Sequence, residues 1–172
     1  TVQQAPANGI TLAYETFGDP ADPPVLLVMG LGTQMLAWPQ ELCELIAARG
    51  HHVIRFDNRD IGMSTHLDHL PTPDPLAVAS HRRAPAYRLE DMAADTIGLI
   101  EAIGRGPVHL VGASMGGFIS QIVALERPDL VRTEAATESI RVLTSSTSRR
   151  AETSGIMISG TTAGARRPTS TV

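Results

Sequence analysis

The first 132 residues alternate between two hydrophobic patterns, one typical of strands and the other of helices. After the turn dipeptide Asn8-Gly9, residues 10–17 alternate between apolar and polar positions, which predicts a half-buried strand. Three short and mostly apolar runs have the length of buried strands, and they lie at residues 25–29, 53–56 and 108–111. We therefore expect four strands in this part of the chain.

Apolar residues at helical spacing separate these runs. Leu42, Leu45 and Ile46 outline a helix that should end at Gly50, a common helix stop. Residues 89–103 have a clear amphipathic pattern, and a further helix is expected after residue 114. Because strands that alternate with helices are typical of βαβ units, the chain is predicted to be an α/β protein with a mostly parallel sheet and flanking helices.

Two segments lack this periodicity. Residues 61–87 contain four prolines and few regularly spaced apolar positions, so we expect a long surface loop. In residues 133–172, 16 of the 40 positions are Ser or Thr and none is aromatic. Such a segment buries little apolar surface, so we expect it to be a disordered, out-of-pattern tail with a short strand at most over 140–143. Residues 1–132 would then form one truncated core domain.

Composition excludes several classes of partner. A formal net charge of −4 and the absence of a basic run argue against a nucleic-acid-binding surface. No apolar run is long enough to span a bilayer, and the N-terminus lacks the features of a signal peptide, so we expect a cytoplasmic protein without a membrane partner. The single cysteine, Cys43, falls within the apolar pattern of the first helix, which favours a packed thiol over a reactive one.

The segment Gly112-Ala-Ser114-Met-Gly116 carries the strongest chemical signal. It lies between a predicted buried strand and a predicted helix. Strand, Gly-x-Ser-x-Gly and helix together predict a nucleophile elbow, a strained turn that exposes a serine hydroxyl above a sheet. Ser114 is therefore the candidate nucleophile.

Two further segments follow predicted strands. Met29-Gly-Leu31-Gly32 comes directly after residues 25–28, where an acyl-transfer site places a loop that donates a backbone N–H to the oxyanion. The candidate donors are the N–H groups of Leu31 and of Met115, the residue after the nucleophile. The third segment, residues 56–64, is a polar turn that contains Asp57, Arg59 and Gly62. Asp57 and Arg59 could contact substrate, but such turns are more often held by their own polar network, which we favour.

The order of these three segments resembles the α/β-hydrolase superfamily. Met29-Gly30, Trp38-Pro39 and residues 55–60 are most similar to the branch that contains aclacinomycin-type methylesterases, and the resemblance covers about residues 8–132. It implies a serine hydrolase that acts on a small apolar ester through an acyl-enzyme on Ser114. Gly30-Leu-Gly32 lacks the third glycine of a dinucleotide fingerprint, and His66 and His69 with Asp68 have no further ligand at a matching spacing, so we expect no cofactor and no metal.

The resemblance also predicts a catalytic acid and then a histidine after the serine, and the chain departs from this order. No histidine follows Ser114. Glu134, Glu138 and Glu152 lie in the wrong context to serve as the acid. We expect an esterase that is impaired without its acid and base, and the alternative is a non-catalytic remnant or binding fragment.

Histidines elsewhere are weaker candidates for the base. His66, His69 and His81 fall in the long loop, which would not hold the geometry that proton transfer needs. His51 and His52 are expected at the surface or edge of a strand, and His109 is expected to be packed within one. Four methionines could line an acyl pocket or fill gaps in the core: Met29, Met35, Met63 and Met115.

Truncation has a physical consequence for the sheet. With no strands beyond it, the strand that leads to Ser114 would be an exposed apolar edge, which is a template for aggregation. We therefore expect a marginally stable or self-associating protein.

Overall fold

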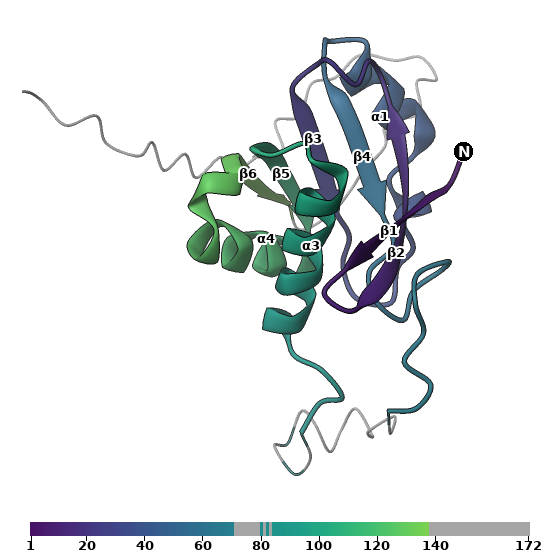
Figure 1. The fold of residues 1–172 in the computed structure, drawn as a ribbon, viewed down its shortest axis with the longest axis vertical. Helices are drawn as coiled ribbons and strands as arrows, with labels where there is room; N and C mark the ends of the chain where they lie inside the picture. The colour runs from purple at the N-terminus through teal and green to yellow at the C-terminus, as the bar shows by residue number, and fades with distance from the viewer. Residues whose placement is uncertain (71–79, 81, 83, 138–172) are drawn as a thin grey trace, which may run out of the picture.

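A computed structural model describes residues 1–70, 80, 82 and 84–137 of the chain, and these residues build one mixed sheet with helices packed on it (Figure 1). The elements are, in chain order, β1 (Gln3–Ala7), β2 (Ile10–Phe17), β3 (Pro24–Val28), η1 (Met35–Ala37), α1 (Gln40–Ala47), β4 (His52–Phe56), α3 (Leu89–Ile103), β5 (Val108–Ala113), α4 (Met115–Glu126), η2 (Pro128–Leu130) and β6 (Val131–Thr137).

The strands lie in the order β1-β2-β4-β3-β5-β6. Strands β4, β3, β5 and β6 are parallel to one another, whereas β1 and β2 form an antiparallel hairpin at one edge. Since the carboxyl ends of parallel strands meet at one edge of a sheet, the loops after β3, β4 and β5 are brought together there. The predicted α/β class with a mostly parallel sheet is confirmed.

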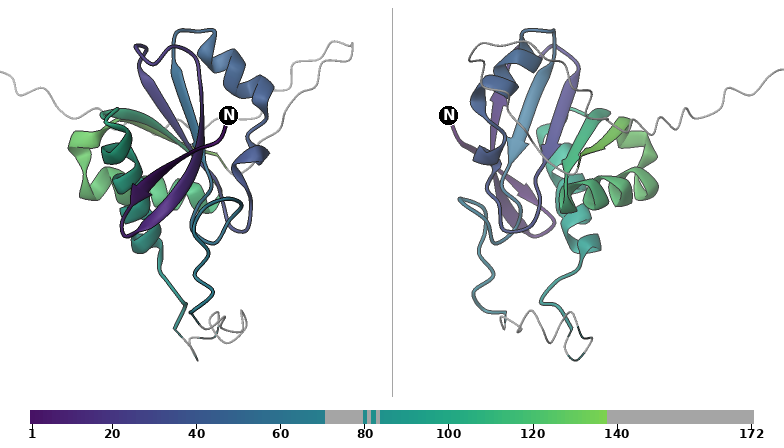
Figure 2. Two further views of the ribbon diagram at one scale, coloured as in Figure 1. Left: turned by 45° about the vertical axis from the view of Figure 1, so that its right-hand side comes forward. Right: turned by 180° about the vertical axis from the view of Figure 1, so that it is seen from behind.

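The two faces of the sheet have separate hydrophobic cores. Along β3, Leu26 and Val28 point to the face covered by α3 and α4, while Val25 and Leu27 point to the face covered by α1. Figure 2 shows this arrangement from two further directions, with α1 on the side of the sheet opposite to α3 and α4. All five residues of β3 are buried, as expected of a strand with helices on both faces.

The strong periodic segments coincide with the observed elements. Strand β2 and helix α3 have the predicted bounds, and the other predicted strands and helices differ by one or two residues at their ends. Strand β1 was not predicted, because Gln3, Gln4 and Pro6 give it neither alternation nor apolar length. It forms through pairing with β2, as an edge strand that tolerates proline.

Strand β6 changes two expectations about the end of the core. It begins at Val131 and continues to Thr137, so residues 133–137, which were expected to lie out of pattern, pair in parallel with β5. Within the described residues the elbow strand β5 is therefore not an edge, because β3 flanks it on one side and β6 on the other. The predicted short strand over 140–143 lies outside the described residues.

His52 differs from its predicted surface position. Its side chain is 6% exposed, the Nδ1 atom has no hydrogen-bond partner within the described structure, and burial lowers the pKa of its imidazole. Residue 52 is the first of β4, which is buried along its whole length between β2 and β3. Cys43 is fully buried as predicted, and burial raises the pKa of its thiol.

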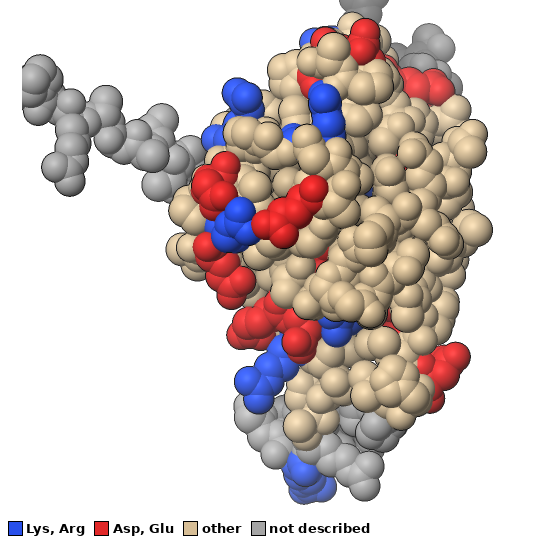
Figure 3. All heavy atoms as spheres, in the orientation of Figure 1, with Lys and Arg blue, Asp and Glu red and all other residues tan. Residues whose placement is uncertain are grey.

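The charged surface carries both signs. On the face drawn in Figure 3, arginines and carboxylates lie side by side over the region of α3 and α4, and the opposite part of this face is mostly uncharged. One such cluster is Arg127 with Glu101 and Asp129. Among the described residues there is no helix with the length and apolarity needed to cross a bilayer.

Candidate functional site

Ser114 occupies a sharp turn between β5 and α4. Its backbone dihedrals are φ 52° and ψ −122°, a combination that non-glycine residues rarely adopt. Such strain costs on the order of 1–3 kcal/mol and persists only where the surroundings enforce it. The residue is exposed, although Gly112 and Ala113 before it and Gly116 and Gly117 after it are buried. This is the geometry that the Gly-x-Ser-x-Gly pattern predicts.

The two glycines that flank Ser114 leave room for close backbone approach. A Cβ atom at Gly112 would collide with the carbonyl oxygen of Gly116, and a Cβ atom at Gly116 would collide with the carbonyl oxygen of Val28. The turn of α4 thus packs directly on the backbone of β5 and β3. Any side chain at either position would force the elbow open.

The loop after β3 lies against the elbow. A Cβ atom at Gly30 would lie 3.2 Å from Cβ of Ser114 and 3.6 Å from the backbone nitrogen of Met115. Leu31, the next residue, is 78% exposed, and Gly32 has a φ of 65°. The structure therefore brings together all three residues that the sequence selected: Ser114, Leu31 and Met115.

The polar turn after β4 is held from within. The Asp57 carboxylate accepts hydrogen bonds from the backbone N–H of Met35 (2.7 Å) and of Met63 (3.1 Å). The Ser64 hydroxyl donates to the Asp57 carbonyl oxygen at 2.6 Å and accepts from the N–H of Ala13 at 2.9 Å. Both side chains are buried, so Asp57 connects the turn to the loop after β3 and is not available to a substrate.

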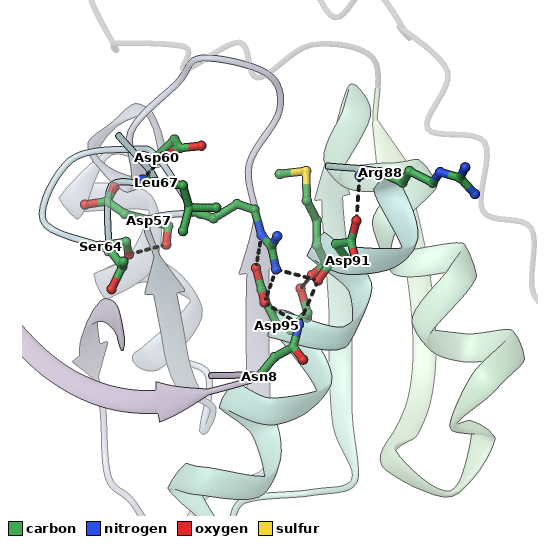
Figure 4. A network of polar contacts seen from close by, with 12 residues as sticks. Asn8, Asp57, Asp60, Ser64, Leu67, Arg88, Asp91 and Asp95 are labelled. Carbon is green, nitrogen blue, oxygen red and sulfur yellow. Dashed lines mark hydrogen bonds and ion pairs between the residues drawn. The ribbon is translucent and has the colours of Figure 1, made fainter. Parts of the chain in front are cut away.

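Arg59 forms a buried ion pair with Asp95 of α3. Its Nε and Nη2 atoms each lie 2.6 Å from a carboxylate oxygen of Asp95, and Nη2 also donates to the carbonyl oxygen of Asp91 at 3.2 Å. The amide of Asn8 donates to the same carboxylate at 2.9 Å, and Figure 4 shows these contacts converging on Asp95. Hydrogen bonding to Asp95 raises the pKa of the Arg59 guanidinium. Asp57 and Arg59 therefore lie in the polar network that the sequence predicts, and Arg59 also lines the cavity described next.

A cavity of about 840 Å³ opens beside the elbow. Its lining includes both residues that were selected as oxyanion donors, Leu31 and Met115, but does not include Ser114 itself. The apolar residues of the lining come from four parts of the chain, and they are Leu31, Ile61, Leu67, Leu70, Pro85, Ala86, Leu89, Met92, Met115 and Ile122. A large and mostly apolar cavity of this kind suits a small apolar molecule.

The four methionines have different environments. Met29 and Met35 are buried in or beside the core and fill space there, whereas Met63 is exposed. Met115 lines the cavity, together with Met92, a residue that the sequence pattern assigned only to the face of a helix.

No general base stands beside the serine in the described part of the chain. There the Ser114 hydroxyl has no hydrogen-bond partner, and the cysteine, carboxylates and histidines form no group of three that could hold a metal ion. His66 lines the cavity, where its Nε2 lies 3.1 Å from the carbonyl oxygen of Gly62. His69 is exposed, and His81 lies outside the described residues.

Two residues near the site were not singled out by the sequence. Asn58 is buried at the carboxyl end of β4, and both Asn58 and Tyr87 line the cavity. The ring of Tyr87 lies 5.1 Å from the guanidinium carbon of Arg59. Asn58 could have been selected by its position, since polar residues that directly follow a parallel strand lie at the edge where sites form. Nothing in the local pattern distinguishes Tyr87.

Comparisons with known proteins agree with this geometry. The family described as alpha/beta hydrolase fold matches residues 23–152. The rhodomycin D methylesterase DauP of Streptomyces sp. strain C5 is 36% identical over 124 residues, which cover 72% of this chain and 37% of that protein. The 3-oxoadipate enol-lactonase 2 of Acinetobacter baylyi is 27% identical over 123 residues, covering 72% and 39% respectively.

Solved structures give the same picture. The thioesterase domain from the curacin biosynthetic pathway superimposes with a TM-score of 0.66 at 26% identity, over 80% of this chain and 46% of that domain. The chain thus spans less than half the length of each of these proteins.

Proposed function

The chain belongs to the α/β-hydrolase family, and on that premise we propose that it acts in the hydrolysis of carboxylic esters, with Ser114 as the nucleophile. One observation carries the proposal: an exposed serine in a strained turn, with the Gly30 loop packed against it. In this proposal the backbone N–H groups of Leu31 and Met115 donate to the oxyanion that forms beside the Ser114 hydroxyl. Methylesterase and lactonase activities, named for two relatives, both break an ester bond.

The proposed reaction has two steps. Ser114 Oγ forms a bond to the carbonyl carbon of the ester while its proton passes to a base, and the N–H groups of Leu31 and Met115 donate to the oxyanion. The alcohol then leaves with a proton, and an acyl-enzyme remains on Ser114. In the second step, water attacks the acyl carbon and releases the acid, and the proton returns to Ser114.

The reaction needs a base, which the family's order places on a histidine after the serine. All six histidines precede Ser114. A serine hydroxyl without a base is a poor nucleophile, although oxyanion donors and binding alone retain some rate above that in water. We propose that these 172 residues react slowly by themselves, at a rate that depends on Ser114.

The substrate is proposed to be an apolar ester. The cavity beside Met115 is lined mainly by aliphatic side chains, and its volume of about 840 Å³ exceeds that of a short acyl chain. Hydrophobic and aromatic linings with few polar groups are typical of sites that bury most of an apolar ligand.

A second candidate is a non-catalytic protein that binds an apolar ligand in the same cavity. The large and mostly apolar cavity beside Met115, which needs no covalent chemistry to hold a ligand, favours it. It keeps the cavity but predicts no covalent chemistry at the serine.

The experiment that separates the two is labelling with a fluorophosphonate, run beside hydrolysis of p-nitrophenyl butyrate. The variants are Ser114→Ala and, as control, Thr96→Val, which removes a buried hydrogen bond to the Met92 carbonyl oxygen within α3, away from the elbow. Labelling that disappears in Ser114→Ala and persists in Thr96→Val supports the esterase. Absence of labelling in the unmodified chain, with binding of an apolar fluorophore retained, supports the binding protein instead.

A further inference from the structure

We propose that Asn58 is a positioning residue that fixes the loop of Leu31 against the elbow and thereby orients an oxyanion donor. The proposal rests on the function proposed above. Asn58 is one of the residues that line the cavity, but its side-chain hydrogen bond goes to the loop after β3 and not to Ser114. It acts through the backbone of the loop after β3.

The contact is a single buried hydrogen bond. The Asn58 side chain is 2% exposed, and its Nδ2 donates to the carbonyl oxygen of Met29 at 3.0 Å. Strands β4 and β3 are parallel neighbours, with Arg55 beside Leu27, so residues just after β4 lie beside residues just after β3. The bond thereby sets the plane of the peptide that joins Met29 to Gly30.

The other end of the same loop is held by the residue next to Asn58. The Asp57 carboxylate accepts the N–H of Met35 at 2.7 Å. Two adjacent buried side chains at the end of β4 therefore anchor Met29 and Met35, and residues 30–34 run between these anchors.

One side-chain hydrogen bond lies within that stretch, from the Thr33 hydroxyl to the carbonyl oxygen of Leu31 at 3.0 Å, and it does not tie the loop to the rest of the fold. Leu31 is 78% exposed and does not pack in either core, and Gly30 and Gly32 have no side chain. Gly30 must nevertheless stay against Ser114, where its Cβ position would be 3.2 Å from that of the serine. The direction of the Leu31 N–H thus depends on the anchors more than on packing.

The expected effect follows from how oxyanion donors work. Removing one donor outright costs on the order of 100- to 1000-fold in rate, and misplacement of a reacting group by about 1 Å costs about 100-fold. Loss of the Asn58 bond leaves the donor in place but unanchored on one side. We expect a loss of about 10- to 100-fold in reactivity.

Asn58→Leu is the cleaner of the two anchor substitutions. Leucine has a similar volume and cannot donate, and the only side-chain hydrogen bond seen for Asn58 in the described residues is the one to Met29. Asp57 also holds Met63, so its removal would disturb the turn after β4 as well. Thr96→Val serves as the matched control, since it too removes one buried side-chain hydrogen bond to a carbonyl oxygen.

Two measurements test the role. The first is the rate constant for fluorophosphonate labelling of Ser114, with kcat and KM for p-nitrophenyl butyrate where turnover is seen. We expect Asn58→Leu to slow labelling 10- to 100-fold and to lower kcat without raising KM, and Thr96→Val to stay within twofold of the unmodified chain. Equal labelling rates in Asn58→Leu and the unmodified chain would overturn the proposal.

The second measurement is the ¹⁵N order parameter of residues 30–33, which does not require reactivity. We expect values typical of ordered backbone in the unmodified chain and values below about 0.6 in Asn58→Leu. Order parameters for residues 30–33 that are the same in Asn58→Leu and in the unmodified chain would overturn the positioning role, even if the serine reacts. If the unmodified chain does not label, the proposed function fails while the order parameters still decide the role of Asn58.

Asn58→Asp provides a test if Asn58→Leu does not fold. A protonated carboxyl can donate to the Met29 carbonyl oxygen, whereas a carboxylate can only repel it. We expect an ordered loop at low pH and a mobile one at high pH in this variant, with no such change in the unmodified chain. A pH-independent loop in Asn58→Asp would contradict the proposal.

Discussion

The ion pair between Arg59 and Asp95 offers a sharp test of how the site is supported. Both side chains are nearly buried, with exposures of 8% and 2%, and two short hydrogen bonds join them. Arg59→Met keeps most of the aliphatic stem and removes the cation. The Asp95 carboxylate is then left buried with the Asn8 amide as its remaining side-chain donor.

The expected cost is large because a buried charge loses its partner. Breaking a buried pair from one side typically costs about 3–5 kcal/mol, whereas replacing both members by apolar residues is often close to neutral. We therefore expect Arg59→Met to lower the free energy of unfolding by about 3–5 kcal/mol. The double variant Arg59→Met/Asp95→Leu should be destabilised by less than the sum of the single changes, with a coupling of at least about 1.5 kcal/mol.

Urea unfolding followed by tryptophan fluorescence measures these free energies, since Trp38 is the only tryptophan and is 3% exposed. A stabilising osmolyte allows the comparison if Arg59→Met is partly unfolded without denaturant. Arg127→Met is the matched control, because Arg127 pairs with Glu101 and Asp129 at the surface and such pairs contribute about 0–1 kcal/mol. Additive effects of the Arg59 and Asp95 changes, or equal costs at Arg59 and Arg127, would refute the reasoning.

Two further predictions concern pH and association. Burial, and after it the nearby Arg105 cation, lowers the pKa of His52 in the folded state. The stability that this group contributes is therefore present above its unfolded pKa of about 6.5, and it is lost as the pH falls through the lower folded value. The urea concentration at half unfolding should decrease when the pH is lowered from 7 to 5, and it should decrease less in His52→Leu than in the surface control His66→Leu. Equal decreases in the two variants would contradict this. Phe118 and Leu125 of α4 are 61% and 83% exposed, close to the outer strand β6, so we expect concentration-dependent association in sedimentation velocity. Phe118→Lys/Leu125→Lys should weaken it, and a monomer at every concentration would disprove it.

The sequence by itself determined the local elements and the elbow. Strand β2 and helix α3 were predicted to the residue because hydrophobic periodicity is a property of neighbouring positions in the chain. Gly112-x-Ser114-x-Gly116 predicted the strained turn for a related reason: the collision that Gly112 avoids lies within the same strand, turn and helix, whereas the one that Gly116 avoids is with Val28 of β3. The nearness of Leu31 and Met115 also followed, once parallel strands were expected.

Only the tertiary structure decided the contacts that hold this site in place. Chain order does not reveal that β4 lies between β2 and β3, which buries His52 and puts Asn58 beside Met29. Strands β1 and β6 have weak patterns of their own and form because neighbouring strands supply their hydrogen bonds. Asp95 is one polar residue on an amphipathic helix until the fold brings Arg59 to it across 36 positions of sequence. Such pairings depend on which strands become neighbours in the sheet, and the spacing of apolar and polar residues along the chain does not predict that order.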